Sequence, residues 1–367
     1  MSRSNTIAFP SEFPEATSPA SSQGLRVTAA GREFLRQRAL PWILLSAGLL
    51  LALIDPAVTA SFAWLPFLVS LFIFGMPHGA MDWTIQNRLD GVHGLLRQAI
   101  AFIPYLALMA LSTFLLVFFP VFTVAAFMLL TTIHFGTADL LATGHGQESL
   151  VRRVLFIAGR GCLILGPAFA FHTQAAWKPF GLLVGLGPAS PSSIQMVSVI
   201  SGTLLFVGVL LAISHLVLTS RSRPRVALLD LFESALILTL STLASPLFAI
   251  GLFFLSTHAY RHSVRLSSDP IAVEPGVTAK FSLTSRLLRM HWRSFPLLIP
   301  TFVVLPIWAY FQFGSIDPYA LVTVTIGFFI ITTLPHHLLG LRLPRGQQSD
   351  GGVAGPGAGG GAAVEGE

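Results

Sequence analysis

Long apolar segments alternate with short polar connections along this chain. A membrane-spanning helix needs roughly 20 mainly apolar residues to cross a hydrocarbon core of about 30 Å. The segments approach that length and lack the two-residue alternation of a transmembrane β-barrel. The pattern therefore predicts an all-α, polytopic transmembrane helix bundle of about ten spans, within a range of eight to ten. The expected spans are 40–54, 60–80, 98–119, 121–140, 153–171, 194–218, 227–244, 247–263, 295–312 and 318–340.

The two ends of the chain differ from this apolar body. Residues 1–38 are polar, with proline and serine early and arginine late, and we expect a partly disordered cytoplasmic leader. We expect residues 39–342 to form the transmembrane catalytic domain. Residues 343–367 are mostly glycine and alanine with a few polar residues, and we expect them to be a disordered tail.

Arginine positions give the expected orientation. Connections rich in Lys and Arg lie on the cytoplasmic side of a membrane protein. Arginines follow the second, fourth, sixth, eighth and last expected spans, whereas the other connections carry only Lys178. We therefore expect both termini in the cytoplasm. The arginines concerned are Arg88, Arg97, Arg152, Arg153, Arg221, Arg223, Arg225, the run from Arg265 to Arg293, Arg342 and Arg345.

Composition narrows the functional classes. Hydrophobic residues make up 53% of the chain and charged residues 10%, which excludes a soluble globular domain. The net charge of +6 comes from arginines beside the apolar segments, so it indicates contact with membrane lipid and not a nucleic-acid partner. The single Cys162 excludes an internal disulfide and an iron–sulfur centre. Any metal must be bound by nitrogen and oxygen.

Histidines recur near the cytoplasmic ends of four expected spans. Polar side chains are costly in a membrane, and imidazole is the commonest protein metal ligand. Four helices that deliver imidazoles to one depth are the arrangement that a metal site in a helix bundle needs. Two of the histidines are spaced i, i+4 and share a helix face. The candidate ligands are His78, His134, His258 and His262.

Two aspartates and two further histidines are expected to support this site. Asp82 follows His78, and Asp139 follows His134, by about one helical turn. A carboxylate at that spacing can accept the free N–H of an imidazole and fix its tautomer. His336 and His337 follow a proline that suggests a helix break beside a cavity, so we expect them to orient ligands or contact substrate.

The remaining polar residues receive simpler interpretations. Histidines in expected loops are usually solvated, and acidic residues in a first turn favour a helix N-terminus. We expect solvated side chains at His93, His145, His172 and His291, a structural or interfacial role for His215, helix-end roles for Asp230 and Glu233, and an interfacial anchor at Arg261.

Together these motifs resemble the Brp/Blh family of bacterial and archaeal β-carotene 15,15′-dioxygenases. The motifs are Pro-His-Gly-x-x-Asp-Trp at 77–83, His-Phe-Gly-x-x-Asp at 134–139, His-x-x-x-His at 258–262 and Pro-His-His at 335–337. The resemblance implies a multi-pass protein of the bacterial cytoplasmic membrane that binds non-haem Fe(II) through His78, His134, His258 and His262. It also implies that β-carotene and O₂ are substrates and that retinal is the product. A rhodopsin-type opsin is a candidate recipient of that retinal.

The residues themselves leave two other functions open. One is a different histidine-ligated membrane iron enzyme, such as a lipid desaturase or hydroxylase. Those enzymes generally carry dense clusters of adjacent histidines, whereas only His336 and His337 are adjacent here. The other is a proton-coupled transporter, whose histidines and aspartates would titrate instead of binding metal. Motifs for a nucleotide or dinucleotide cofactor are absent from the sequence, and a polyene that reduces O₂ itself would need none.

Overall fold

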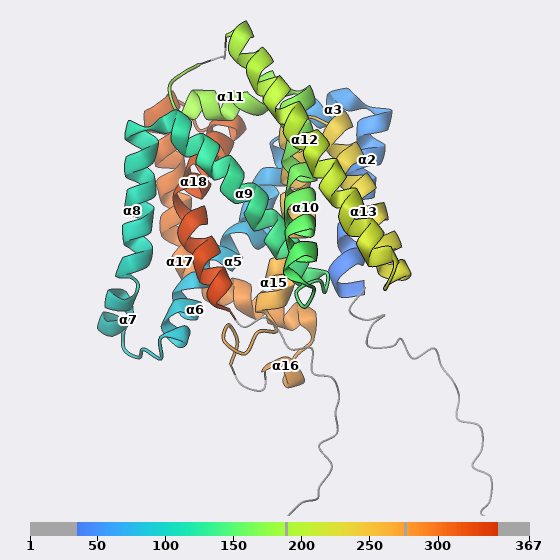
Figure 1. The fold of residues 1–367 in the computed structure, drawn as a ribbon. Coiled ribbons are helices and arrows are strands. Elements are labelled where there is room, and N and C mark those ends of the chain that lie inside the picture. Colours follow the sequence, from blue (N-terminus) through green and yellow to red (C-terminus); the bar gives the residue numbers. More distant parts are fainter. Residues whose placement is uncertain (1–34, 188–189, 275–276, 344–367) are drawn as a thin grey trace, which may run out of the picture.

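A computed structural model describes residues 35–187, 190–274 and 277–343. Residues 1–34 of the expected leader and residues 344–367 of the expected tail lie outside these ranges. All regular elements in the described ranges are helices, so the prediction of an all-α bundle is confirmed (Figure 1). Eight of these helices are long and apolar enough to cross a membrane, or nine if one bent pair counts as a single span. The protein is therefore a membrane protein.

The first half of the described chain runs up and down the bundle. Its elements are η1 (Leu35–Ala39), α2 (Leu40–Ile54), α3 (Pro56–Ser61), α4 (Leu65–Ser70), η2 (Leu71–Gly75), α5 (Met76–Ala80), α6 (Asp82–Leu89), α7 (Leu95–Ala101), α8 (Ile103–Phe118) and α9 (Pro120–Ala142). The η elements are π-helical turns. The expected span 98–119 is the bent pair α7 and α8, which meet at 43°.

The second half completes the bundle around the same centre. Its elements are α10 (Leu150–Phe171), α11 (Thr173–Leu183), α12 (Pro191–Ser220), α13 (Pro224–Leu243), α14 (Pro246–Phe253), η3 (Phe254–Ala259), α15 (Tyr260–Leu266), α16 (Val277–Lys280), α17 (Leu283–Phe313) and α18 (Pro318–Arg342). Helix α17 begins well before the expected residue 295, because Ser282 caps it and its arginine-rich first turns are helical too.

The continuous helix formed by α14, η3 and α15 is the most buried part of the fold. Its first turns pack in a hydrophobic core with α2 and α13, where Leu45, Ile237, Leu240 and Phe253 are all buried. Its later turns carry histidine and arginine, so the helix is too polar to count among the candidate membrane spans. Its polar side chains are buried inside the bundle.

Glycines allow α9, α10 and α12 to pack at very short range. A Cβ atom at Gly136 of α9 would lie 2.1 Å from the carbonyl oxygen of Ile157 in α10. A Cβ atom at Gly161 of α10 would lie equally close to the carbonyl oxygen of Thr132. Small residues at helix contacts are typical of membrane bundles, where packing replaces the hydrophobic effect as the main attraction between helices.

We expect Gly136→Ala to destabilise the protein by about 1–3 kcal/mol, because the added methyl group would push two helix backbones apart. The midpoint of thermal unfolding in detergent measures this loss. Gly202→Ala is the matched control, since a Cβ atom there meets nothing within 4 Å. Equal midpoints for the two variants would show that α9 and α10 can separate at no cost.

Candidate functional site

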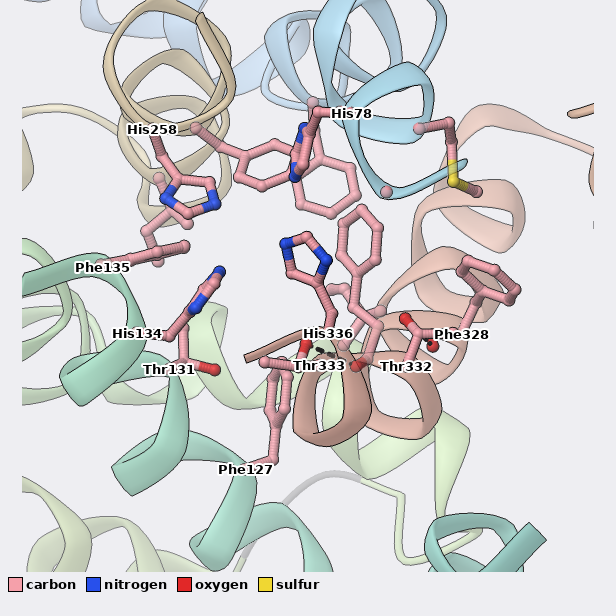
Figure 2. A pocket seen from close by; sticks show the side chains of 18 of the residues that line it. His78, Phe127, Thr131, His134, Phe135, His258, Phe328, Thr332, Thr333 and His336 are labelled. Carbon is pink, nitrogen blue, oxygen red and sulfur yellow. Dashed lines mark hydrogen bonds between the residues drawn. The ribbon is translucent and has the colours of Figure 1, made fainter. Parts of the chain in front are cut away.

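A cavity of about 310 Å³ lies inside the bundle and is lined mainly by aromatic and aliphatic side chains. Its walls include Phe127 and Phe135 from α9, Phe254 from η3, and Phe328 and Phe329 from α18. Four histidines gather at one part of this wall and point toward one another, as Figure 2 shows. They are His78, His134, His258 and His336.

The histidine rings form one cluster. The ring centres of His78 and His262 are 5.0 Å apart, and those of His134 and His258 are 4.8 Å apart. His336 lies between them, with its ring centre 5.2 Å from that of His78 and 5.4 Å from those of His134 and His262. The fold thus brings together all four histidines expected as ligands, and His336 joins them. His262 belongs to the cluster but does not line the cavity.

Hydrogen bonds engage one nitrogen of several of these rings. His78 places Nδ1 2.7 Å from the carbonyl oxygen of Phe74, to which it donates. His134 places Nδ1 3.1 Å from Nδ1 of His337. His336 places Nδ1 2.8 Å from Oδ2 of Asp82. A partner on one ring nitrogen fixes the tautomer and leaves the other nitrogen available to a metal.

Two buried nitrogens in the cluster have no hydrogen-bond partner. They are Nδ1 of His258 and Nε2 of His336. A buried polar atom without a partner carries a free-energy cost, which a bound ion would remove. Two imidazoles bound to one ion through bonds of about 2.1 Å have ring centres roughly 5 Å apart, close to the spacing found here. The side chains therefore fit a metal ion bound by imidazole nitrogen.

Asp82 links the cluster to a tyrosine. Its Oδ2 atom accepts a hydrogen bond from the hydroxyl of Tyr105, 2.7 Å away, as well as from His336. The expected carboxylate support of an imidazole is thus present at Asp82, where the imidazole is that of His336. Asp139 differs from the expectation, because its carboxylate faces Arg261 and Arg160.

Two π-helical turns lie next to the histidines. Turn η2 ends at Gly75, just before His78, and η3 contains His258. A π-turn inserts an extra residue into a helix and is frequent at functional sites. Hydrophobic periodicity does not reveal such a turn, so neither of these two turns was predicted.

Behind the cluster, three arginines and three carboxylates are buried together. Arg261 places Nη2 2.8 Å from Oε2 of Glu233, and it also pairs with Asp139. Arg38 places Nη2 2.7 Å from Oδ1 of Asp230. The third arginine is Arg160, whose Nε atom lies 3.2 Å from Asp139. This set of six is called the buried ion network below, and it holds the helix that carries His258 and His262.

The network corrects three interpretations of the sequence. Arg261 is 1% exposed, so it is not an interfacial anchor. Asp230 and Glu233 are equally buried, and each pairs with arginine, so they do more than favour a helix N-terminus. The sequence did not indicate this arrangement, because the partners come from five different elements.

Histidines outside the cluster give mixed outcomes. His93 is exposed, as expected of a loop residue, and His172 and His291 are half-buried. His145 is fully buried, so the prediction of a solvated side chain is wrong. Its ring packs against Phe156 and against His215, which is buried as well.

Comparison with known proteins agrees with this geometry. The chain is 26% identical over 273 residues to the probable β-carotene 15,15′-dioxygenase Blh of Halobacterium salinarum, a match that covers 69% of this chain and 76% of the relative. No solved structure matches the chain. A sequence model of the family described as β-carotene 15,15′-dioxygenase matches residues 69–343, which include every histidine of the cluster. Because that match covers well over half of the chain, this protein belongs to the β-carotene 15,15′-dioxygenase family.

Proposed function

We propose that this protein uses O₂ to cleave the central 15,15′ double bond of β-carotene into two molecules of retinal at an Fe(II) ion bound by His78, His134, His258 and His262. The observation that carries the proposal is the convergence of these histidines in one cluster, of which His78, His134 and His258 face an apolar cavity (Figure 2). Membership of the family supports the choice of substrate.

The ligand set suits iron in this reaction. Neutral imidazole is a good ligand for Fe(II), and it leaves the charge of the ion uncompensated. When bound, the iron would supply a site at which O₂ can be activated. Imidazoles whose second nitrogen is already engaged, as in His78 and His134, are held in one orientation by this chain.

The cavity suits a polyene. The hydroxyls of Thr332 and Thr333 donate to carbonyl oxygens of their own helix, at 2.9 and 2.6 Å, and so present little unsatisfied polarity to a ligand. The hydroxyl of Thr131, which also lines the cavity, has no hydrogen-bond partner. The surrounding phenylalanines offer apolar faces. Such a cavity holds a hydrocarbon by shape and excludes water from the reacting carbons.

The reaction balances without another cofactor. The carbon–carbon double bond and the O–O bond break, and two carbon–oxygen double bonds form, so each half of β-carotene gains one oxygen atom. The polyene supplies the electrons that reduce O₂. No proton is consumed, and no side chain has to act as an acid or a base.

Expression in bacteria that accumulate β-carotene tests the proposal. We expect retinal, measured by chromatography, from the intact chain and not from His258→Ala. Absence of retinal from both, with both proteins present in the membrane, would contradict the proposal. An iron content of about two ions per chain, bound within the histidine cluster, would favour a di-iron lipid desaturase. Binding of a solute by the metal-free protein would favour a transporter.

We expect Asp82→Asn to weaken iron binding by about 10–100-fold, because the amide cannot hold His336 as the carboxylate does, and His336 adjoins three proposed ligands. Iron retained during dialysis against a graded chelator series measures the change. Asp90→Asn is the control, since Asp90 pairs with Arg342 near the surface. If Asp82→Asn retains iron as the unmodified protein does, Asp82 does not support the site.

A further inference from the structure

A second group of metal-ligating side chains lies outside the cavity. His145 and Glu148 come from the turn between α9 and α10, and His215 comes from α12. None of the three lines the cavity, and none belongs to the buried ion network. The turn lies at the end of the bundle where α15 is found (Figure 1). This group is called the turn cluster below.

The donor atoms of the turn cluster converge. His145 Nδ1 is 3.0 Å from Oε1 of Glu148, and His215 Nε2 is 3.1 Å from Oε2 of the same carboxylate. One ligand atom from each of the three residues lies within 4.8 Å of the other two. The two histidines are almost completely buried, and the Glu148 side chain is only 7% exposed. Two imidazoles and a carboxylate are a ligand set that zinc commonly takes.

Asp230 gives the turn cluster a feature typical of metal sites. Its Oδ2 atom lies 2.9 Å from Nε2 of His145, on the side of the ring away from Glu148. Metal-binding histidines usually direct their second nitrogen at a carboxylate, which fixes the ring and makes the first nitrogen more basic. His145 is thus oriented with Nδ1 toward the point where Glu148 and His215 meet.

Arg223 occupies the position that a cation would take. Its guanidinium contacts Glu148 and lies 3.4 Å from Nδ1 of His145. Its side chain is 37% exposed, so its guanidinium can turn out into water and remain solvated. The carboxylate would then be available to an ion. An arginine and a cation would therefore compete for Glu148.

We propose that the turn cluster is a second metal site, which binds one divalent ion of the zinc class through Nδ1 of His145, Nε2 of His215 and the carboxylate of Glu148, with Arg223 displaced. Such an ion would fasten the α9–α10 turn to α12 and, through Asp230, to α13. The site has a structural role that is separate from cleavage. It does not depend on the function proposed for the cavity.

Zinc titration of the full-length, metal-stripped protein in detergent tests this site, with bound zinc counted after equilibrium dialysis. The cavity histidines also take zinc, so we expect two ions per chain in the unmodified protein and one in Glu148→Gln. We expect Arg223→Gln to bind the second ion about fivefold more tightly, because the ion no longer has to displace a half-exposed ion pair.

A variant of the cavity cluster separates the two sites. We expect the double variant His258→Ala/His262→Ala to keep the zinc ion of the turn cluster. If this double variant binds as much zinc as the unmodified protein and Glu148→Gln binds none, the turn cluster is the metal site and the proposed iron ligands are wrong.

Two results would overturn the turn-cluster proposal. One is equal zinc binding by the unmodified protein and Glu148→Gln. The other is an Arg223→Gln variant whose zinc affinity is unchanged or weaker, which would show that Glu148 forms a closed ion-pair network with Arg223 and the two histidines. The second result decides the question even if Glu148→Gln fails to fold.

Discussion

Iron bound to the purified protein is expected to fall from about one ion per chain to less than roughly a tenth of that in His134→Ala, with retinal formation lowered more than about 100-fold. His134 faces the cavity from α9, and its ring lies close to those of His258 and His336 (Figure 2). Loss of a direct ligand should exceed the effect of losing its hydrogen-bond partner. Iron analysis by mass spectrometry and chromatographic assay of retinal measure the two changes.

His93→Ala is the matched control for this experiment. His93 is exposed in the connection between α6 and α7, so its loss should change neither iron content nor retinal formation. If His134→Ala keeps both its iron and its cleavage activity, the ligand set proposed for the cavity is wrong.

Replacement of Arg261 by methionine is expected to destabilise the protein by about 3–5 kcal/mol, because it leaves a buried negative charge without a partner. In the buried ion network, three arginines balance three carboxylates, and Arg261 contacts two of the carboxylates directly. It also donates from Nε to the carbonyl oxygen of Gln37, 2.7 Å away. The midpoint of thermal unfolding in detergent measures the loss.

Arg342→Met provides the comparison for Arg261→Met. Arg342 pairs with Asp90, but its side chain is 45% exposed, and exposed pairs contribute about 0–1 kcal/mol. A double variant, Arg261→Met with Glu233→Gln, should recover part of the stability, because it removes the unpaired charge as well. A loss at Arg261 no larger than that at Arg342 would contradict the role given to the network.

Hydropathy predicted the fold well, because a segment that crosses a lipid bilayer as a helix must consist mainly of apolar residues. Each of the ten expected spans is mostly helical in the structure, including 60–80, whose helix begins only at Leu65, 98–119, which is bent, and 247–263, which is too polar to count as a candidate span. The short helix α11 was not expected, since it lies in the connection between two spans. The orientation of the bundle in the membrane remains a prediction from the arginine positions.

Residue type and expected depth in the membrane predicted which histidines would lie together. Side chains at similar positions along neighbouring regular helices lie at similar depths in the bundle. The contacts between them depend on tertiary packing and could not be predicted. Asp82 follows His78 in the chain but supports His336, which lies on another helix. His145 resembles a solvated loop residue, yet the fold buries it against Phe156. Arg261 is buried because it pairs with carboxylates, and those carboxylates are distant from it in the sequence.

The π-turn that contains His258 determines what a one-residue deletion would do to the helix formed by α14, η3 and α15. In a regular helix, each added or removed residue turns all later side chains by about 100° around the axis. Turn η3 already holds the extra residue, so a one-residue deletion within it could restore an ordinary helix with little backbone strain. That shorter helix would turn His258 and His262 relative to Phe253 and the core before it. Chains that share this helix but differ by one residue here would therefore keep the fold and lose the cluster.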